Sequence, residues 1–240
     1  MEIITDDRSN LAPRAGEAIT QVIEQYPETP LLLLFSGGSA LSIIEHIDAQ
    51  AIDSRVTLSV LDERFGVSEE ESNFAQLATT DFYANATAAG AFTIDPRGIE
   101  GEGLEENARW FEAALYGWQQ KNPGGIVVAT QGIGDDGHTA GILPFADNVE
   151  YFTATFDQTD RWAVGYEVSA EKSAYTQRIT VTVPFLRTIV TSGVVYAVGE
   201  KKQQVLSAVL NQPDASQAKM PARVINQMND ILLCTDQDIA

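Results

Sequence analysis

Residues 31–40, with the sequence LLLLFSGGSA, give the clearest indication of the fold. The unbroken apolar run at 31–35 is typical of a parallel strand that is covered on both faces. The segment Ser36-Gly37-Gly38-Ser39 ends this run, and residues 40–47 have a helical pattern. A buried strand that turns through glycines into a helix is typical of an α/β sheet that binds ligands at its strand ends.

Outward from this stretch, expected helices and strands alternate along the chain. Further helices are expected over residues 11–23, 72–83, 104–121 and 200–210. Further strands are expected over 56–61, 126–130, 194–198 and 231–234, with partly antiparallel strands within 151–183. Strands separated by such helices require right-handed crossovers. We therefore predict a doubly wound, mostly parallel α/β sheet with helices on both faces and a few antiparallel strands.

Length and composition indicate one globular domain. The chain has 240 residues, 44% of them hydrophobic, and no Pro/Gly/Ser-rich linker divides it, so we expect a single domain over residues 1–240. The apolar runs are too short to cross a bilayer, and the acidic N-terminus does not resemble a secretory signal. The one cysteine, Cys234, lies in an apolar run and is expected to be buried. These features favour a cytoplasmic protein.

The charge balance excludes several classes of partner. The chain has 15 Lys and Arg residues against 34 Asp and Glu residues, a formal net charge of −19. Nucleic acids and anionic membranes bind to basic surfaces, and this chain has no Lys/Arg cluster larger than the pair Lys201-Lys202, so we expect neither partner. An anionic small molecule would have to be held by a few cations that converge on one pocket.

Polar or glycine-rich residues follow three of the expected strands, at 36–39, 62–64 and 132–138. Because ligands of such sheets bind beyond the carboxyl ends of the strands, we expect these segments to meet in an active site. Residues 36–39 offer glycines, hydroxyls and the free N–H groups of a helix start, which suit a phosphate; a simple capped turn is the alternative. In Asp62-Glu63-Arg64 the arginine can clamp a phosphate and Asp62 can accept a proton or orient a partner; the alternative is a solvated charge run.

His138 is the strongest candidate for chemistry. It lies in the glycine-rich segment GIGDDGHTA (132–140), two residues after Asp136. Imidazole moves protons near neutral pH, and a neighbouring carboxylate can fix its tautomer. A metal site would need more ligands than the segment offers, and the G-x-S-x-G motif of many serine hydrolases does not occur. The other histidine, His46, is expected on the surface.

Six segments together resemble the ordered motifs of 6-phosphogluconolactonases, which belong to a wider group that includes glucosamine-6-phosphate deaminases. They are SGGSA (36–40), LDERFGVSEEESN (61–73), GIGDDGHTAGILP (132–144), RITVT (178–182), VGEKKQQVL (198–206) and MPARVI (220–225). Arg64 and residues 139–144 favour the lactonases over the deaminases. Gly141 departs from the pattern, since the family commonly has serine there, and so does Gln131, where the family commonly has an apolar residue.

The resemblance implies an enzyme that hydrolyses 6-phospho-D-glucono-1,5-lactone to 6-phosphogluconate in the oxidative pentose phosphate pathway. It implies that His138 is the general base, with Asp136 beside it. The residues implied for binding the substrate and its phosphate are Ser36, Gly37, Gly38, Ser39, Asp62, Arg64, Arg178 and Lys202. We expect that the protein needs no metal and no organic cofactor. Its expected small-molecule partner is a phosphosugar lactone, and its expected oligomeric state is a monomer or a weak homodimer.

Two other functions remain open from the sequence. An amino-sugar phosphate deaminase would share the architecture and release ammonia. A sugar-phosphate sensing module of a transcription regulator would share it as well, although the acidic charge does not suit an attached DNA-binding segment. His138 and Asp136 argue against a module that only binds.

Overall fold

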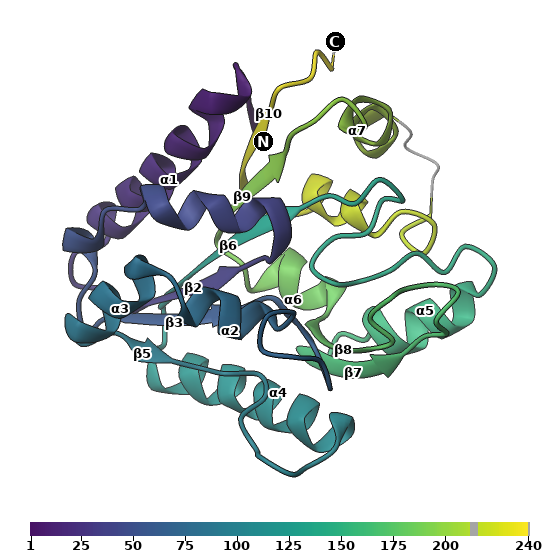
Figure 1. Cartoon of the computed structure of the whole chain (residues 1–240), viewed down its shortest axis with the longest axis horizontal. Coiled ribbons are helices and arrows are strands. Elements are labelled where there is room, and N and C mark those ends of the chain that lie inside the picture. Colours follow the sequence, from purple (N-terminus) through teal and green to yellow (C-terminus); the bar gives the residue numbers. More distant parts are fainter. Residues whose placement is uncertain (212–215, 240) are drawn as a thin grey trace.

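The central sheet of the computed structural model, which describes residues 1–211 and 216–239, has seven parallel strands (Figure 1). Their order is β1-β10-β9-β6-β2-β3-β5. Their bounds are β1 (Glu2–Thr5), β2 (Leu31–Phe35), β3 (Val56–Val60), β5 (Phe92–Thr93), β6 (Ile126–Gly132), β9 (Ser192–Ala197) and β10 (Asp230–Thr235). The strand order reverses between β2 and β6, and such a reversal opens a crevice at the carboxyl ends of the two strands.

Helices cover both faces of this sheet. They are α1 (Arg8–Gln25), α2 (Asn73–Ala78), α3 (Asp81–Ala88), α4 (Leu104–Lys121), α5 (Val149–Phe156), α6 (Val183–Thr188) and α7 (Lys202–Asn211), with the 3-10 helices η1 (Gly38–His46), η2 (Ala49–Ala51) and η3 (Pro221–Asn226). Most of them follow a strand and return the chain to the start of the next strand (Figure 1). The predicted doubly wound α/β fold is confirmed.

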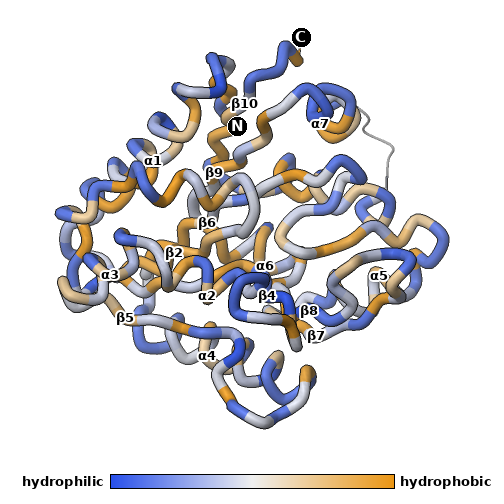
Figure 2. The backbone as a smooth tube through the Cα atoms, viewed as in Figure 1, coloured by the Kyte–Doolittle hydropathy of each residue, from blue (hydrophilic) through white to orange (hydrophobic). Residues whose placement is uncertain are grey.

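The apolar run of β2 supplies both layers of the core. Leu33 and Phe35 pack in the cluster that contains Leu11 of α1, whereas Leu34 packs in the cluster that contains Phe111 of α4. Successive side chains of a strand point to opposite faces, so a strand that is covered on both sides needs apolar residues at every position. Apolar residues are concentrated along these central strands (Figure 2).

A second sheet of three antiparallel strands lies beside the main one, with the order β4-β8-β7. Its strands are β4 (Asp62–Arg64), β7 (Ala163–Glu167) and β8 (Gln177–Val181). The chain passes from β3 through Leu61 directly into β4. The backbone of Leu61 is hydrogen-bonded to both sheets: its N–H donates to the carbonyl of Phe35, and its carbonyl accepts from the N–H of Val181, each at 3.0 Å. The polar segment after β3 therefore forms a strand of the second sheet.

The structure corrects two element predictions. Residues 151–156, part of the segment expected to form strands, instead lie in helix α5, because Oδ1 of Asn148 accepts from the N–H of Tyr151 at 3.0 Å and Phe152 and Phe156 share one buried face. The helix expected over 72–83 is divided into α2 and α3, because Thr80 starts a new helix by accepting from the N–H of Tyr83 at 3.1 Å.

Several short elements also differ from expectation. The helical stretch after β2 is the 3-10 helix η1, and the edge strands β1 and β5 were not predicted. Cys234 is buried, as predicted. Within residues 1–211 and 216–239, the search for a helix long and apolar enough to cross a membrane finds none.

Candidate active site

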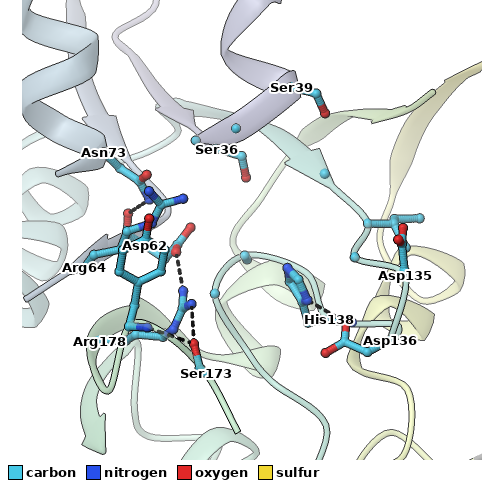
Figure 3. A pocket seen from close by; sticks show the side chains of 18 of the residues that line it. Ser36, Ser39, Asp62, Arg64, Asn73, Asp135, Asp136, His138, Ser173 and Arg178 are labelled. Carbon is cyan, nitrogen blue, oxygen red and sulfur yellow. Dashed lines mark hydrogen bonds and ion pairs between the residues drawn. The ribbon is translucent and has the colours of Figure 1, made fainter. Parts of the chain in front are cut away.

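A cleft of about 630 Å³ opens at the carboxyl ends of β2 and β6. It is lined by every residue that the sequence predicts for the site, namely Ser36, Gly37, Gly38, Ser39, Asp62, Arg64, Asp136, His138, Arg178 and Lys202. Figure 3 shows two walls, with Arg64 and Arg178 on one side and His138, Asp136 and Asp135 on the other. The structure thus brings together residues from segments that lie up to 166 positions apart, as Ser36 and Lys202 do.

His138 forms a pair with Asp136 in the loop after β6. Its Nδ1 lies 2.6 Å from Oδ1 of Asp136, and its backbone N–H donates to the same oxygen at 3.1 Å. When Nδ1 carries the hydrogen, the lone pair of Nε2 is left to accept a proton. Burial works to raise the pKa of Asp136, but the hydrogen bonds and charge of His138 outweigh it and hold that pKa below its ordinary value.

A glycine beneath the imidazole ring makes this pairing possible. A Cβ on Gly134 would lie 2.1 Å from Nδ1 of His138, so a larger residue would displace the ring. The backbone of the loop closes on itself, since the N–H of Gly134 donates to the carbonyl of His138 at 2.8 Å. Gly134 therefore leaves the space that the histidine ring occupies.

Lys202 reaches the same wall from the start of α7. Its ammonium donates to Oδ1 of Asp135, and this hydrogen bond holds the pKa of Asp135 below its usual range. The two pairs, His138–Asp136 and Lys202–Asp135, are formed by adjacent aspartates. Lys202 thus brings positive charge to the cleft with a carboxylate already bound to it.

Arg64 and Arg178 form the opposite wall. They are direct partners in the antiparallel pairing of β4 and β8, so both side chains leave the same face. Nη1 of Arg64 donates to the carbonyl of Glu71 at 3.1 Å, and Nη2 of Arg178 donates to Oγ of Ser173 at 3.3 Å. The Nε atoms of both arginines are buried and have no hydrogen-bond partner among the described residues.

Asp62 lies beneath the two arginines. Its Oδ2 is 3.5 Å from Nη1 of Arg178, and only 9% of its side chain is exposed. Burial raises the pKa of Asp62 above its ordinary value, although the charges of Arg178 and Arg64 act in the opposite direction. Asp62 therefore places a buried carboxyl group next to the guanidinium group of Arg178.

Glu63 holds this wall in place without facing the cleft. It is fully buried, and its carboxylate accepts the N–H groups of Arg64, Asn73 and Phe74 at 2.7 to 2.8 Å and the hydroxyl of Ser72 at 2.9 Å. Burial raises the pKa of Glu63 against the opposing effect of these hydrogen bonds. A carboxylate at the first turn of α2 also suits the positive end of that helix. The sequence did not indicate this role.

The segment after β2 is shaped by close contacts with the rest of the cleft. The N–H of Ser36 donates to Oγ1 of Thr130 at 3.0 Å, which ties the end of β2 to β6. A Cβ on Gly37 would lie 2.1 Å from Oδ1 of Asn73, so the backbone must approach this side chain without one. Gly38 has a φ of +67° and begins η1. The first turn of η1 therefore borders the cleft, as the sequence predicts.

Sequence reasoning missed part of the lining. Asn73 ends the segment LDERFGVSEEESN, and its Nδ2 donates to the carbonyl of Asp62 at 2.9 Å. Ser173, Ala174 and Tyr175 reach the cleft from the loop between β7 and β8, where no motif marked them. His46, in contrast, is exposed at the end of η1 and outside the cleft lining, as predicted.

Comparisons with known proteins identify the family. The family model described as "Glucosamine-6-phosphate isomerases/6-phosphogluconolactonase" matches residues 6–233. The chain belongs to this family. Among curated proteins, a 6-phosphogluconolactonase of Mesorhizobium japonicum is 29% identical over 140 residues, and one of Pseudomonas putida is 30% identical over 122 residues. These matches cover 58% and 50% of this chain but only 56% and 47% of the two relatives, so the chain spans about half the length of the curated relatives it matches.

Solved structures with the same fold come from both branches of the family. A 6-phosphogluconolactonase of Shewanella baltica has a TM-score of 0.74 and 19% sequence identity, covering 98% of this chain and 96% of its own. A 6-phosphogluconolactonase of Plasmodium vivax has a TM-score of 0.75 and 15% identity, covering 99% and 91%. A monomeric glucosamine-6-phosphate deaminase has a TM-score of 0.74 and 15% identity, covering 100% and 97%. At these identities the structures show the fold of the family alone.

The structure explains one departure of this chain from the family's motifs. Gly141 has a φ of +69°, and a Cβ there would lie 2.5 Å from both Cβ and Oδ2 of Asp62. A serine at this position would require Asp62 to move. Gln131 is fully buried beside the same loop, where its Oε1 accepts from Thr139 and its Nε2 donates to Sδ of Met228, both at 3.2 Å.

Proposed function

We propose that this protein hydrolyses 6-phospho-D-glucono-1,5-lactone to 6-phosphogluconate, a step of the oxidative pentose phosphate pathway. One observation carries the proposal: a single cleft opposes a carboxylate-paired imidazole to a pair of directly opposed arginines. A lactone with a distant phosphate needs both a proton acceptor and an anion-binding wall. The names of both curated relatives support the same reaction.

His138 acts as the general base in this proposal. Its Nε2 removes a proton from a water molecule as the water oxygen attacks C1, the lactone carbonyl carbon. Asp136 keeps the Nδ1 hydrogen in place and stabilises the imidazolium that forms. The tetrahedral intermediate then expels the ring oxygen, which takes the proton back from the imidazolium and becomes the 5-hydroxyl group. Because a lactone is an activated ester, this assistance suffices without a cofactor.

The remaining residues of the cleft bind and orient the substrate. Arg64 and Arg178 offer charged N–H donors to the phosphate, with residues 36–39 beside them. Holding the phosphate at one end fixes the reacting carbon relative to His138 at the other. Polar donors of the cleft stabilise the oxyanion of the intermediate.

The experiment that tests the proposal measures continuous hydrolysis of freshly generated 6-phosphogluconolactone with and without the protein. The comparison without protein is essential, because the lactone also hydrolyses spontaneously. A rate that does not increase in proportion to protein concentration contradicts the proposal.

A deaminase is the second candidate, because the fold is equally close to that of a glucosamine-6-phosphate deaminase. The same preparation is therefore incubated with glucosamine 6-phosphate in a coupled ammonia assay. Ammonia release without lactone hydrolysis would reject the lactonase and support the deaminase. Product formation in neither assay, combined with binding of both sugar phosphates, would favour a sensing module.

A further inference from the structure

The positions of Arg64 and Arg178 create an electrostatic problem. Like charges that lie directly opposite each other on an antiparallel strand pair are destabilising. Asp62 supplies one carboxylate, 3.5 Å from Arg178, for two guanidinium groups. The two arginines therefore keep excess positive charge, and the Nε–H of each has no acceptor among the described residues.

Tyr175 is an uncharged group that contacts both arginines. Its ring centroid lies 4.2 Å from Cζ of Arg64 and 5.7 Å from Cζ of Arg178. The face of an aromatic ring attracts a cation within about 6 Å of its centroid. One ring thus draws both guanidinium groups to the same place on the cleft wall.

The loop that carries Tyr175 is held at several points. The N–H of Tyr175 donates to Oγ of Ser173 at 3.2 Å, and the same oxygen accepts from Arg178 at 3.3 Å. Lys172 donates to the carbonyl of Pro144 and lies 3.8 Å from the ring of Phe145. These contacts fix the loop between β7 and β8 to the segment that follows the His138 loop, so the ring has a defined position.

We propose that Tyr175 is a positioning residue that holds Arg64 and Arg178 side by side as one anion-binding pair for the phosphate group of the substrate. The proposal rests on the proposed function for the identity of that phosphate. An aromatic ring attracts the guanidinium groups without accepting their in-plane N–H bonds. A second carboxylate at this place would accept hydrogen bonds from the guanidinium groups and repel the phosphate, whereas the ring does neither.

Binding of inorganic phosphate, measured by isothermal titration calorimetry, tests the proposal without requiring catalysis. The variants are Tyr175→Leu, which removes the aromatic face, and Tyr175→Phe, which keeps it. We expect Tyr175→Leu to weaken phosphate binding by about 3- to 30-fold, the range that a cation–π contact accounts for. We expect Tyr175→Phe to restore the affinity to within about 2-fold, since a phenyl face also attracts cations.

Tyr26→Leu is the matched control, because Tyr26 is a half-buried tyrosine outside the cleft lining. It should leave the phosphate affinity unchanged. In the lactonase assay, Tyr175→Leu should raise KM for the phosphorylated lactone with little change in kcat. For unphosphorylated gluconolactone it should change neither constant.

The outcomes separate this proposal from the proposed function. Equal phosphate affinity of the unaltered protein and Tyr175→Leu, or no phosphate binding by the unaltered protein, would overturn the role of Tyr175 whether or not the lactone is hydrolysed. Equal losses on phosphorylated and unphosphorylated lactones would also overturn it, since they indicate a structural role. Ring-dependent phosphate binding without lactone hydrolysis would support the positioning role and reject the lactonase.

Discussion

The two walls of the cleft are built in opposite ways. The side chains of Arg178 and Asp62 are 10% and 9% exposed and come from paired strands. Those of His138 and Asp136 are 41% and 54% exposed and lie on a glycine-rich loop. A wall that binds an anion gains from rigid, desolvated donors, whereas a wall that moves protons from water must remain open to solvent. Under the proposed function, we therefore expect binding at the sheet and chemistry at the loop.

Removal of His138 is expected to have the largest effect. If the open wall performs the chemistry, His138→Ala should lower kcat by about 10²- to 10⁴-fold, the usual contribution of a general base. Because the ring is exposed and, among the described residues, hydrogen-bonds only to Asp136, the fold should persist. The measurement combines lactonase kinetics with a thermal unfolding curve.

His46→Ala is the control for this variant, because His46 is exposed and lies outside the cleft lining. Its kinetics should match those of the unaltered protein. Turnover close to normal in His138→Ala would remove this histidine from the mechanism.

Removal of an arginine is expected to have the next largest effect. Charged hydrogen bonds contribute about 1.5–3 kcal/mol each, so Arg64→Ala or Arg178→Ala should lower kcat/KM for the phosphorylated lactone by about 10- to 100-fold. Unphosphorylated gluconolactone should show a much smaller loss. If both substrates lose equally, the arginines support the cleft and do not bind the phosphate.

Substitution of Glu63 tests whether the wall that carries Arg64 depends on the hydrogen bonds of this buried carboxylate. Glu63→Gln turns an amide toward donors that the carboxylate now accepts. The mismatch should lower the free energy of unfolding by about 1–3 kcal/mol, as for an unsatisfied buried group. Urea unfolding measures the loss, with the exposed Glu28→Gln as the control. An unchanged unfolding midpoint would show that α2 and β4 are held by other contacts.

Lys202 is expected to contribute less than the arginines. Its ammonium already bonds Asp135, so part of its charge is compensated before a ligand enters. We expect Lys202→Ala to lower kcat/KM by about 3- to 10-fold, comparable to one partly exposed charged contact. A loss as large as that of Arg64→Ala would show that the phosphate contacts both walls.

Chelation is expected to have no effect. The two aspartates of the His138 loop are each engaged by a basic side chain, and the described residues hold no group of three His, Cys, Asp or Glu side chains placed for a metal ion. Incubation with EDTA followed by desalting should therefore leave the lactonase rate unchanged. Lost activity that a single divalent cation restores would contradict this expectation.

The sequence could predict the features that depend on short stretches of chain. The apolar run of β2 and its glycine turn indicate a strand buried on both faces, and the spacing of Asp136 and His138 indicates their pairing. The pairing of strands could not be predicted in the same way. The direct opposition of Arg64 and Arg178 depends on the register of two strands that lie 114 positions apart, which no local pattern encodes.

Other features depend on contacts between distant segments. Tyr175 lies in a hairpin loop with ordinary composition, and only its distance to the two arginines reveals its place in the cleft. Glu63 looks like part of an exposed charge run until the structure shows it beneath the start of α2. Helix α5 was missed because its aromatic residues suit a strand by propensity, while their packing four residues apart selects a helix.

The edge position of β1 has a consequence for synthesis of the chain. Among the described strands, β1 pairs only with β10, at the opposite end of the sequence. A ribosome releases β1 before the other described strands and β10 after them, so β1 must wait for the chain between them before it can join the sheet. Such a long-range pairing forms late and slows folding. Until then, the nascent chain exposes an unpaired strand that chaperones or other chains can bind.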